Sequence, residues 1–174
     1  ILKEMEDIED VSVVTMQAGS GAGYPGVPSL DILGNLIPHI GGEEDKICAE
    51  TKKILGVPGK PLDIGVTVHV HRVPIAHGHT IAAHVQFKKK VSQTQVMTAL
   101  KKAEAKWPDF IKVHTADDRP QPLRDLTPHD MRTHVGRIKQ GDRSDTVGFV
   151  ALGHNLVRGA AGAAIAILEA YLED

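Results

Sequence analysis

The chain has 174 residues, of which 41% are hydrophobic and 24% charged, as expected for one soluble globular domain with a sizeable core. Its formal net charge of -2 gives no chain-wide electrostatic reason to expect a nucleic acid or an anionic membrane as a partner. No apolar run approaches the ~20 residues that span a bilayer, and the single cysteine, Cys48, excludes an internal disulfide.

The first third of the chain combines strand, loop and helix patterns. Residues 1–10 carry no signal-peptide pattern, which with the lone cysteine favours a cytoplasmic protein, and they resemble the charged end of a helix that begins upstream. Residues 11–16 alternate and are rich in β-branched side chains, which predicts a strand. The glycine-rich residues 20–26 predict irregular structure. Residues 43–55 place apolar side chains opposite a charged face, which predicts a helix that ends at Gly56.

The middle of the chain predicts two strands and a capped helix. Residues 64–73 and 80–87 have strand patterns and are joined by a short turn at residues 76–78. Ser92 and Gln95 form a capping box at the start of a helix. The inner stripe of that helix and the residue that ends it are Val96, Leu100, Ala103, Trp107 and Pro108.

The last third predicts a polar surface excursion, two further strands and a closing helix. Residues 115–128 are polar and contain prolines, whereas residues 134–139 and 147–152 have strand patterns. Residues 157–172 predict a helix with almost no polar face, which we expect to be buried between this domain and another. The whole pattern predicts an α+β fold with a mixed, largely antiparallel sheet covered by helices.

Four histidines lie close together in the sequence, at positions 69, 71, 77 and 79. His69 and His71 are alternate residues of a strand and therefore point the same way. Imidazole is a common zinc ligand, but no Asp, Glu or Cys joins the four at close spacing. We therefore expect no metal site.

Arg72 and His79 form a more specific pair. A guanidinium offers a rigid fork that matches a carboxylate in two parallel hydrogen bonds. A histidine just past a glycine in a turn can be partly exposed and can transfer protons near neutral pH. An arginine on a strand and a histidine on the following turn can converge on one small anionic substrate.

Glu43 and Lys46 lie three residues apart on the predicted helix. Taken alone, they are explained by a solvent-facing ladder of charges with Glu50 and Lys53. The helix by itself therefore indicates no binding role.

The glycine-rich segment at residues 20–23 could let main-chain amides approach a ligand, because glycine lacks the Cβ that blocks such an approach. It lacks the lysine of a phosphate loop and the glycine spacing of a dinucleotide fingerprint. Asn155 suits the N-cap of the closing helix, and its amide could equally donate to a ligand there. Cys48 has no base near it in sequence and is interpreted as an ordinary small residue.

Five segments in this order resemble the C-terminal half of one enzyme family. They are VSVVTMQAGSGAGY (residues 11–24), PGVPSLDIL (25–33), residues 43–55, RVPIAHGHT (72–80) and HNLVRGAAG (154–162). Over nearly its whole length the chain thus resembles the archaeal and fungal-type branch of aspartate-semialdehyde dehydrogenase. The resemblance implies that residues 1–174 are a catalytic and dimerisation domain with the fold of the glyceraldehyde-3-phosphate-dehydrogenase C-terminal domain.

The resemblance implies the NADPH-dependent reductive dephosphorylation of aspartyl 4-phosphate to aspartate semialdehyde, a step in the biosynthesis of lysine, threonine and methionine. In the family, a cysteine thiolate forms a thioacyl enzyme, hydride reduces it, and a histidine moves the protons. By position, His79 matches the general acid/base, and Gln17 matches the glutamine beside the nucleophile.

Substrate and cofactor positions follow from the same resemblance. Arg72 matches the arginine that binds the substrate α-carboxylate, and Glu43 the residue that faces its amino group. Lys46 matches the phosphate-binding lysine. The positions that we assign to NADP are Asn155, near the nicotinamide, together with Ser20 and Gly21.

The chain departs from the family pattern in three ways. The N-terminal NADP-binding domain, with its nucleophilic cysteine, is absent from a chain that begins at Ile1, so we expect a fragment or processed product that is inactive alone. Residues 154–174 would pack against that domain. His71 stands where asparagine is usual, and His77 stands where an aspartate is common.

Two further interpretations remain open. The two unusual histidines are similar to those of archaeal malonyl-CoA reductases, so reduction of an acyl-CoA is an alternative, although Val73-Pro74 and the Glu43/Lys46 pair favour the amino-acid phosphate. The chain could also be a non-catalytic dimerisation fragment. In this family the sheet pairs with its twin, so the resemblance implies a homodimer or homotetramer.

Overall fold

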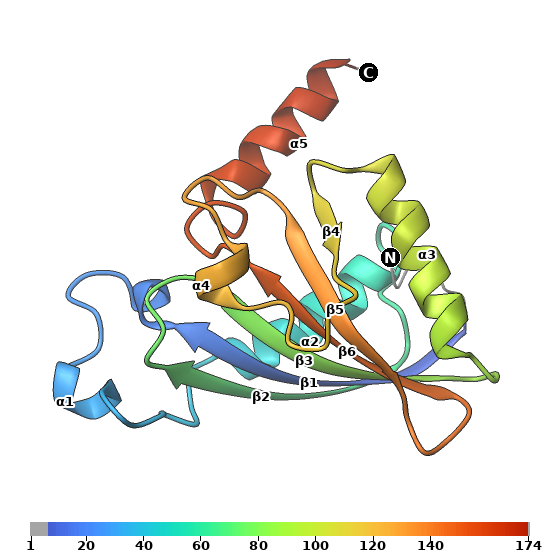
Figure 1. Ribbon diagram of the computed structural model, residues 1–174, viewed down its shortest axis with the longest axis horizontal. Helices are drawn as coiled ribbons and strands as arrows, with labels where there is room; N and C mark the ends of the chain where they lie inside the picture. Colours follow the sequence, from blue (N-terminus) through green and yellow to red (C-terminus); the bar gives the residue numbers. More distant parts are fainter. Residues whose placement is uncertain (1–6, 174) are drawn as a thin grey trace.

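The structure, a computed structural model, describes residues 7–173 and is built around one six-stranded sheet (Figure 1). The strands lie in the order β2-β1-β3-β6-β5-β4. Their bounds are β1 (Ile8–Ala18), β2 (Gly65–Val73), β3 (His79–Phe87), β4 (Ile111–Val113), β5 (Thr133–Gln140) and β6 (Thr146–Gly153). The helices are α1 (Ser29–Ile32), α2 (Glu43–Leu55), α3 (Gln93–Lys106), α4 (Pro122–Asp125) and α5 (Ala161–Glu173), with a 3₁₀ turn η2 (Gly19–Ala22).

The sheet is mixed and largely antiparallel, as the sequence predicts. β1 runs parallel to β2 and antiparallel to β3. β6 lies antiparallel between β3 and β5, and the short β4 joins β5 in parallel. The predicted α+β fold is therefore confirmed.

β2 and β3 follow one another in the chain but do not pair, because β1 lies between them. The turn at residues 74–78 therefore crosses the end of β1, and Gly19 N–H donates to the Ile75 carbonyl at 2.8 Å. This central place of β1 puts its last residues between the strands that carry Arg72 and His79.

Two helices cover one face of the sheet. α2 has the bounds that the sequence predicts, and α3 has the predicted capping box, with Ser92 Oγ accepting from Gln95 N–H at 3.2 Å. The apolar side of α3 packs onto the strands, and Leu55 of α2 packs against the same cluster. The buried members of this core are Ile8, Val11, Ile64, Val85, Phe87, Val96, Leu100, Val113, Val135, Ile138 and Val147.

Several local predictions are wrong. Residues 8–10, predicted as the end of a helix, open β1, because Ile8 pairs with Phe87 in the sheet; residues 1–6 lie outside the described residues. β4 was not predicted, since three residues show no readable alternation. Trp107, predicted on the inner stripe of α3, is 40% exposed at its C-terminal end. The closing helix begins at residue 161, after a run of turns.

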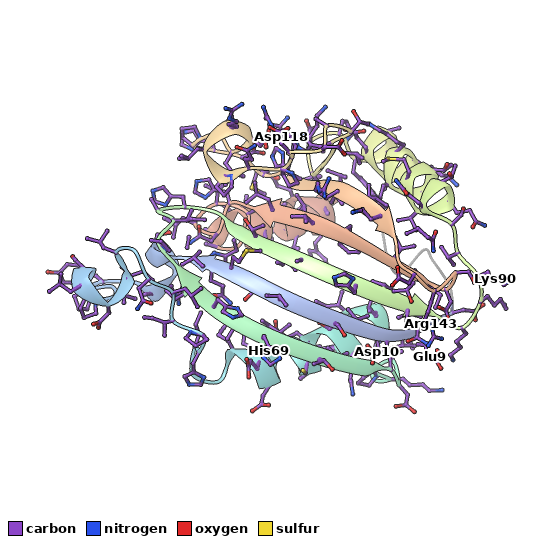
Figure 2. All side chains as sticks on the ribbon, turned by 60° about the horizontal axis from the view of Figure 1, so that its bottom comes forward. Glu9, Asp10, His69, Lys90, Asp118 and Arg143 are labelled. Carbon is purple, nitrogen blue, oxygen red and sulfur yellow. The ribbon has the colours of Figure 1, made fainter. Side chains whose placement is uncertain are left out.

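The opposite face of the sheet is open over β1, β2 and β3, and Figure 2 shows it with His69 labelled. Val14, 38% exposed, pairs in register with His69, and Ser12 pairs with His84. Both histidines are exposed. An exposed sheet face of mixed polarity is suited to contact with another protein surface.

α5 projects away from the sheet (Figure 1). Its large apolar side chains are more than half exposed, so the expected burial against another domain remains a prediction. They are Ile165, Ile167, Leu168, Tyr171 and Leu172. Within residues 7–173, no helix has the length and apolar character needed to cross a membrane.

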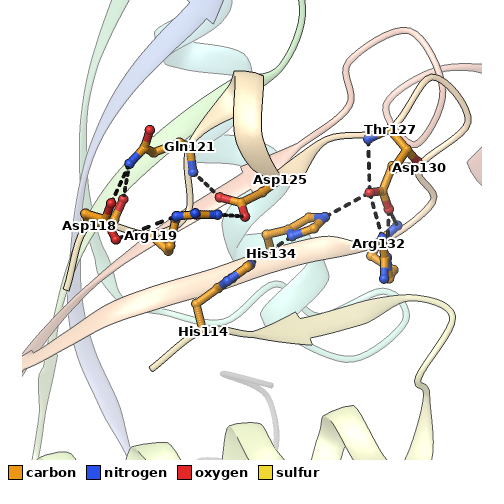
Figure 3. Close-up of polar contacts among 9 residues, drawn as sticks. All are labelled: His114, Asp118, Arg119, Gln121, Asp125, Thr127, Asp130, Arg132 and His134. Carbon is orange, nitrogen blue, oxygen red and sulfur yellow. Dashed lines mark hydrogen bonds and ion pairs between the residues drawn. The ribbon is translucent and has the colours of Figure 1, made fainter. Parts of the chain in front are cut away.

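A buried ionic network ties residues 114–132 to β5 (Figure 3). His134 is 2% exposed; its Nε2 lies 3.1 Å from Asp130 Oδ2 and its Nδ1 lies 3.0 Å from His114 Nε2. Arg132 donates to the two carboxylate oxygens of Asp130 at 2.9 and 3.0 Å. Burial raises the pKa of Asp130, but the hydrogen bonds from Arg132 and His134 outweigh it and hold that pKa far below its ordinary value.

Asp130→Asn should lower the free energy of unfolding by about 3 kcal/mol, because Arg132 and His134 lose their ionised partner. Denaturant unfolding at neutral pH measures it. The lowered pKa implies that the contribution of Asp130 is present above its unfolded pKa and is lost as the pH falls toward the folded one. Asp118→Asn, at a carboxylate that is 64% exposed, is the control and should change stability by less than about 1 kcal/mol. Equal losses in the two variants would contradict this account.

Candidate active site

Three strands meet at one corner of the sheet and bring polar side chains to its helix-covered face. Gln17 of β1 and Arg72 of β2 are partners in register, so their side chains lie on the same side. Met16 pairs with Thr80, which places the preceding residue, His79, beside Gln17 on that side. Gln17 and Arg72 are each 6% exposed, and His79 is half-buried.

The main chain of Ala18 holds two of these side chains at once. Arg72 Nη1 donates to the Ala18 carbonyl at 2.7 Å, and Ala18 N–H donates to His79 Nδ1 at 3.1 Å. Ala18 itself is fully buried. The guanidinium and the imidazole are therefore fixed relative to each other by one peptide segment.

Gly21 lies directly against the same two side chains. A Cβ at Gly21 would stand 2.9 Å from Arg72 Nη1 and 2.9 Å from His79 Cε1, which is closer than real Cβ contacts allow. The glycine-rich segment after β1 therefore touches both the arginine and the histidine. Only a residue without a side chain fits here, unless its neighbours shift.

Glu43 and Lys46 join the corner from the first turn of α2. Gln17 Nε2 lies 3.5 Å from Glu43 Oε2, and Lys46 Nζ lies 3.4 Å from Glu43 Oε1. The Lys46 side chain is 57% exposed, so the pair contributes little to stability. The Glu43 carboxylate lies close enough to act on the buried arginine, and the Lys46 ammonium lies against that carboxylate.

The electrostatics of the corner favour an uncharged imidazole. Burial lowers the pKa of Arg72, against the opposing charge of Glu43, but a guanidinium remains charged in proteins. Burial and then the charge of Arg72 lower the pKa of His79, whereas Glu43 and a hydrogen bond to the main chain of Gly78 raise it. At neutral pH we therefore expect a charged Arg72 beside a neutral His79.

The hydrogen bond from Ala18 also sets the tautomer of His79. Nδ1 must offer a lone pair to Ala18 N–H, so the neutral ring carries its proton on Nε2. A charged ring can instead donate to the main chain of Gly78. The imidazole thus has a main-chain partner in both charge states.

Asn155 does not cap a helix, which corrects the prediction from its sequence. α5 begins at Ala161, so Asn155 lies in the turns before it. Its Oδ1 accepts from Gly78 N–H at 2.9 Å and its Nδ2 donates to Ser20 Oγ at 2.9 Å. Asn155 thus holds together the segment after β1 and the turn before His79.

The four closely spaced histidines do not converge. His69 and His71 lie on the strand side opposite Arg72, toward the open face, whereas His79 lies in the corner. His69 Nδ1 lies 3.9 Å from Glu44 Oε1, a loose contact at an exposed position. Among residues 7–173, no three side chains of the metal-ligating types stand close enough to hold an ion.

The predicted site residues therefore fall into two groups around Ala18. One group consists of Arg72 with Gln17, His79 and Glu43 near it, and of Lys46, which contacts Glu43. The other, Ser20, Gly21 and Asn155, lies over the turn that carries His79. Nothing in the sequence points to Ala18, because an alanine acts here only through its main chain, and nothing points to the packing of His77 on His154.

Comparisons with known proteins show which chains this one is similar to. Residues 1–158 match the family described as the semialdehyde dehydrogenase dimerisation domain. The aspartate-semialdehyde dehydrogenase of Archaeoglobus fulgidus is 42% identical over 186 residues, which cover 99% of this chain and 54% of the relative. The malonyl CoA reductase (NADP) of Metallosphaera sedula is 36% identical over 182 residues, covering 94% of this chain and 50% of the relative.

A solved structure shares the fold. The aspartate semialdehyde dehydrogenase of Candida albicans, crystallised with NADP, superposes with a TM-score of 0.79 at 34% identity, over 97% of this chain and 51% of that one. The chain thus spans about half the length of the relatives that it matches.

Glu43→Gln should lower the pKa of His79 further, because the nearby carboxylate favours the charged ring. An NMR titration of the His79 Cε1 proton measures the change. Glu50→Gln, at an exposed position on the same helix, is the matched control and should leave the titration of His79 where it is. A rise in the pKa of His79 on removing Glu43 would show that the carboxylate does not face the ring.

Proposed function

The chain belongs to the semialdehyde dehydrogenase family through its dimerisation domain, and from this premise we propose that it is the catalytic and subunit-pairing half of an aspartate-semialdehyde dehydrogenase. The whole enzyme would catalyse the NADPH-dependent reductive dephosphorylation of aspartyl 4-phosphate to aspartate semialdehyde, in the biosynthesis of lysine, threonine and methionine. The free thiol of Cys48 is in keeping with a place in the reducing cytoplasm.

One observation carries the proposal: Ala18 holds Arg72 and His79 side by side, with Glu43 next to them. One N–H of the Arg72 guanidinium donates to the Ala18 carbonyl. Its other N–H groups can still donate to a carboxylate. A buried guanidinium strongly favours an anionic ligand, since an unpaired buried charge is costly. The α-carboxylate of an amino acid has the matching shape and charge.

The other polar groups fit the remaining parts of the same substrate. Glu43 offers a carboxylate to the α-amino group, and Lys46 offers an exposed ammonium to the phosphate. Gln17, within reach of Glu43, would lie beside the reacting thioester. His79 would donate from Nε2 to the substrate carbonyl oxygen in its neutral form and transfer the proton in its charged form.

The residues present also fit a contact with NADP, which supplies the hydride of the reaction when bound. Gly21 has no Cβ to keep a ligand away from Arg72 and His79. Ser20 presents a partly exposed hydroxyl. The Asn155 amide is hydrogen-bonded within the chain through both its oxygen and its nitrogen. Asn155 would therefore position Ser20 and Gly78 for the contact with NADP.

The nucleophilic cysteine would lie in sequence beyond these 174 residues, in keeping with the half-length match to the relatives. Cys48 does not replace it. Its Sγ lies 3.6 Å from the Val66 carbonyl, on the part of α2 that packs against β2. The apolar surface of α5, with residues 154–160, would pack against the domain that carries the cysteine and most of the NADP site.

The relative from Metallosphaera sedula supports a second candidate, the reduction of an acyl-CoA. His71 and His77 also favour it. Glu43 and Lys46 favour the amino-acid phosphate, because a malonyl group has no amino group for Glu43 to bind. Assay of the whole enzyme with NADPH and malonyl-CoA, and in reverse with aspartate semialdehyde and phosphate, decides between the two.

Arg72→Lys, made in the whole enzyme, should lower kcat/KM for aspartate semialdehyde by about tenfold or more, mainly through KM. The reason is that an ammonium cannot form two parallel hydrogen bonds with a carboxylate. Steady-state kinetics in the reverse direction measures the change. Arg124→Lys, at an exposed position, is the control. An unchanged kcat/KM for the Arg72 variant would show that Arg72 does not bind the substrate carboxylate.

His79→Asn should lower kcat by about 10²–10⁴, the range for loss of a general acid or base. Asparagine keeps a polar group at the position but cannot titrate. His129→Asn, at an exposed histidine, should leave kcat unchanged. A loss for His79→Asn of less than about tenfold would mean that another group carries the proton.

The open face of β1, β2 and β3 is the proposed contact with a second copy, and pairs of dimers could form a tetramer. Sedimentation of the chain at tens of micromolar should show a dimer. Val14→Glu, on that face, should give a monomer, because two like charges would be buried together. Ile54→Glu, on the helix-covered side, should leave the dimer intact. A monomeric unmodified chain would contradict the proposed interface.

A further inference from the structure

The turn that leads into His79 depends on the conformation of one glycine. Gly78 has a φ of 94°, in the left-handed region that residues with a side chain rarely adopt. Its N–H donates to Asn155 Oδ1 at 2.9 Å, and its main chain favours the charged ring of His79 through a hydrogen bond. The position of Gly78 therefore sets where the next residue, His79, enters the corner.

Three apolar side chains pack against the bare α-carbon of Gly78. A Cβ at this position would stand 2.5 Å from Leu126 Cδ1, 3.1 Å from Leu152 Cδ1 and 3.6 Å from Pro122 Cβ. The first distance is shorter than real Cβ contacts allow, so the Leu126 methyl group lies directly on the glycine. Leu152 belongs to β6 and is 1% exposed, whereas Pro122 and Leu126 belong to the segment of residues 114–132. The turn is thus held between the sheet and that segment.

Two buried carboxylates fix the chain on either side of Leu126 (Figure 3). Asp125, whose side chain is 6% exposed, accepts from Arg119 Nη1 at 2.6 Å. Thr127 N–H donates to Asp130 Oδ2 at 3.4 Å, and Asp130 belongs to the buried ionic network on β5. The residues before and after Leu126 are therefore tied down, which keeps its side chain against the glycine.

An open cavity beside Leu126 gives the turn space into which it could move. The cavity has a volume of about 530 Å³ and is lined by Ala76 and His77 of the turn and by Pro122, Leu123 and Leu126 of the facing segment. Shortening the Leu126 side chain would enlarge this space next to the turn. The turn, and His79 with it, could then shift.

We infer that Leu126 is a positioning residue for His79: its methyl group holds Gly78 against β6 and so keeps the imidazole on the main chain of Ala18, beside Arg72. The inference rests on the proposed function only in its consequence for turnover, because the position of the ring can be measured in the chain alone. A leucine that merely covers the surface would affect stability without changing His79.

Leu126→Ala removes the methyl groups that touch Gly78. The pKa of His79 should rise toward its ordinary value, because burial and the charge of Arg72, which lower it, act less on a ring that has moved away. The scalar coupling between the Ala18 amide nitrogen and His79 Nδ1 should weaken. Nitrogen-15 NMR of the histidines across a pH titration measures both.

In the whole enzyme, Leu126→Ala should lower kcat by about tenfold and change KM by less than about twofold, because a small displacement of a catalytic group slows the chemical step. The carboxylate-binding side chain, Arg72, keeps its bond to the Ala18 carbonyl in this variant. Steady-state kinetics separates the two constants.

Leu123→Ala is the matched control, because Leu123 lines the same cavity on α4 but is 96% exposed. It should leave the pKa and the coupling of His79 as they are. Leu126→Met keeps a flexible apolar side chain of similar volume and should behave like the unmodified chain. If the alanine variant does not fold, Leu126→Val, which shortens the side chain by one carbon, should raise the pKa of His79 to a smaller extent.

An unchanged pKa and an unchanged coupling of His79 in a folded Leu126→Ala or Leu126→Val chain would overturn the inference. An equal change in the Leu123→Ala chain would overturn it as well. Neither result would touch the proposed function, which the kinetics of the Arg72 and His79 variants test separately. Failure of those kinetics would leave the effect of Leu126 on the ring measurable.

Discussion

Two of the predicted site residues, on different strands, are held by the peptide groups of one buried alanine. The carbonyl of Ala18 accepts from Arg72 at 2.7 Å, and its N–H donates to His79 at 3.1 Å. Because β1 lies between β2 and β3, its last residue stands between the strands that carry these side chains. The central position of β1 is therefore the constraint that brings the guanidinium and the imidazole together.

The charges of the corner follow from this packing. A buried arginine keeps its charge, and its field together with burial lowers the pKa of His79, while Glu43 limits the effect. The result is a corner with a fixed positive charge, a neutral ring that donates from Nε2 and a carboxylate at its edge. The proposed substrate, an amino-acid phosphate, is a small zwitterion with an additional anionic group, and such a set of charges would complement it.

Two exposed surfaces near the corner are suited to contact with other protein surfaces. On one side the sheet face with Val14, His69 and His84 is open, and at the C-terminal end α5 exposes its apolar side chains. An apolar helix surface and an open sheet face are each stabilised by a covering partner. The chain spans about half the length of its relatives, in keeping with a neighbouring domain as one of these partners.

Local patterns in the sequence predicted the elements that depend on local chemistry. The bounds of α2 and the capping box of α3 follow from helix periodicity and from Ser92 with Gln95, and both are confirmed. The place of β1 between β2 and β3 could not be predicted, because strand order depends on pairing between distant segments.

The same distinction holds for the site. Arg72 and His79 could be singled out from the chemistry of their side chains and from a family resemblance. Ala18 could not, because it acts through main-chain groups that every residue has. The sequence wrongly predicts a helix cap at Asn155 for a related reason: its partners, Ser20 and Gly78, lie far away in the sequence.

The most direct test of the account is the hydrogen bond between Ala18 and His79, observed by nitrogen-15 NMR of the chain above the pKa of the ring. If Ala18 holds His79 in this way, the imidazole is neutral with its proton on Nε2, and a scalar coupling crosses the hydrogen bond from the Ala18 amide nitrogen to Nδ1. A neutral ring protonated on Nδ1, with no coupling to Ala18, would contradict it, because the histidine would then not be held where the arginine is held.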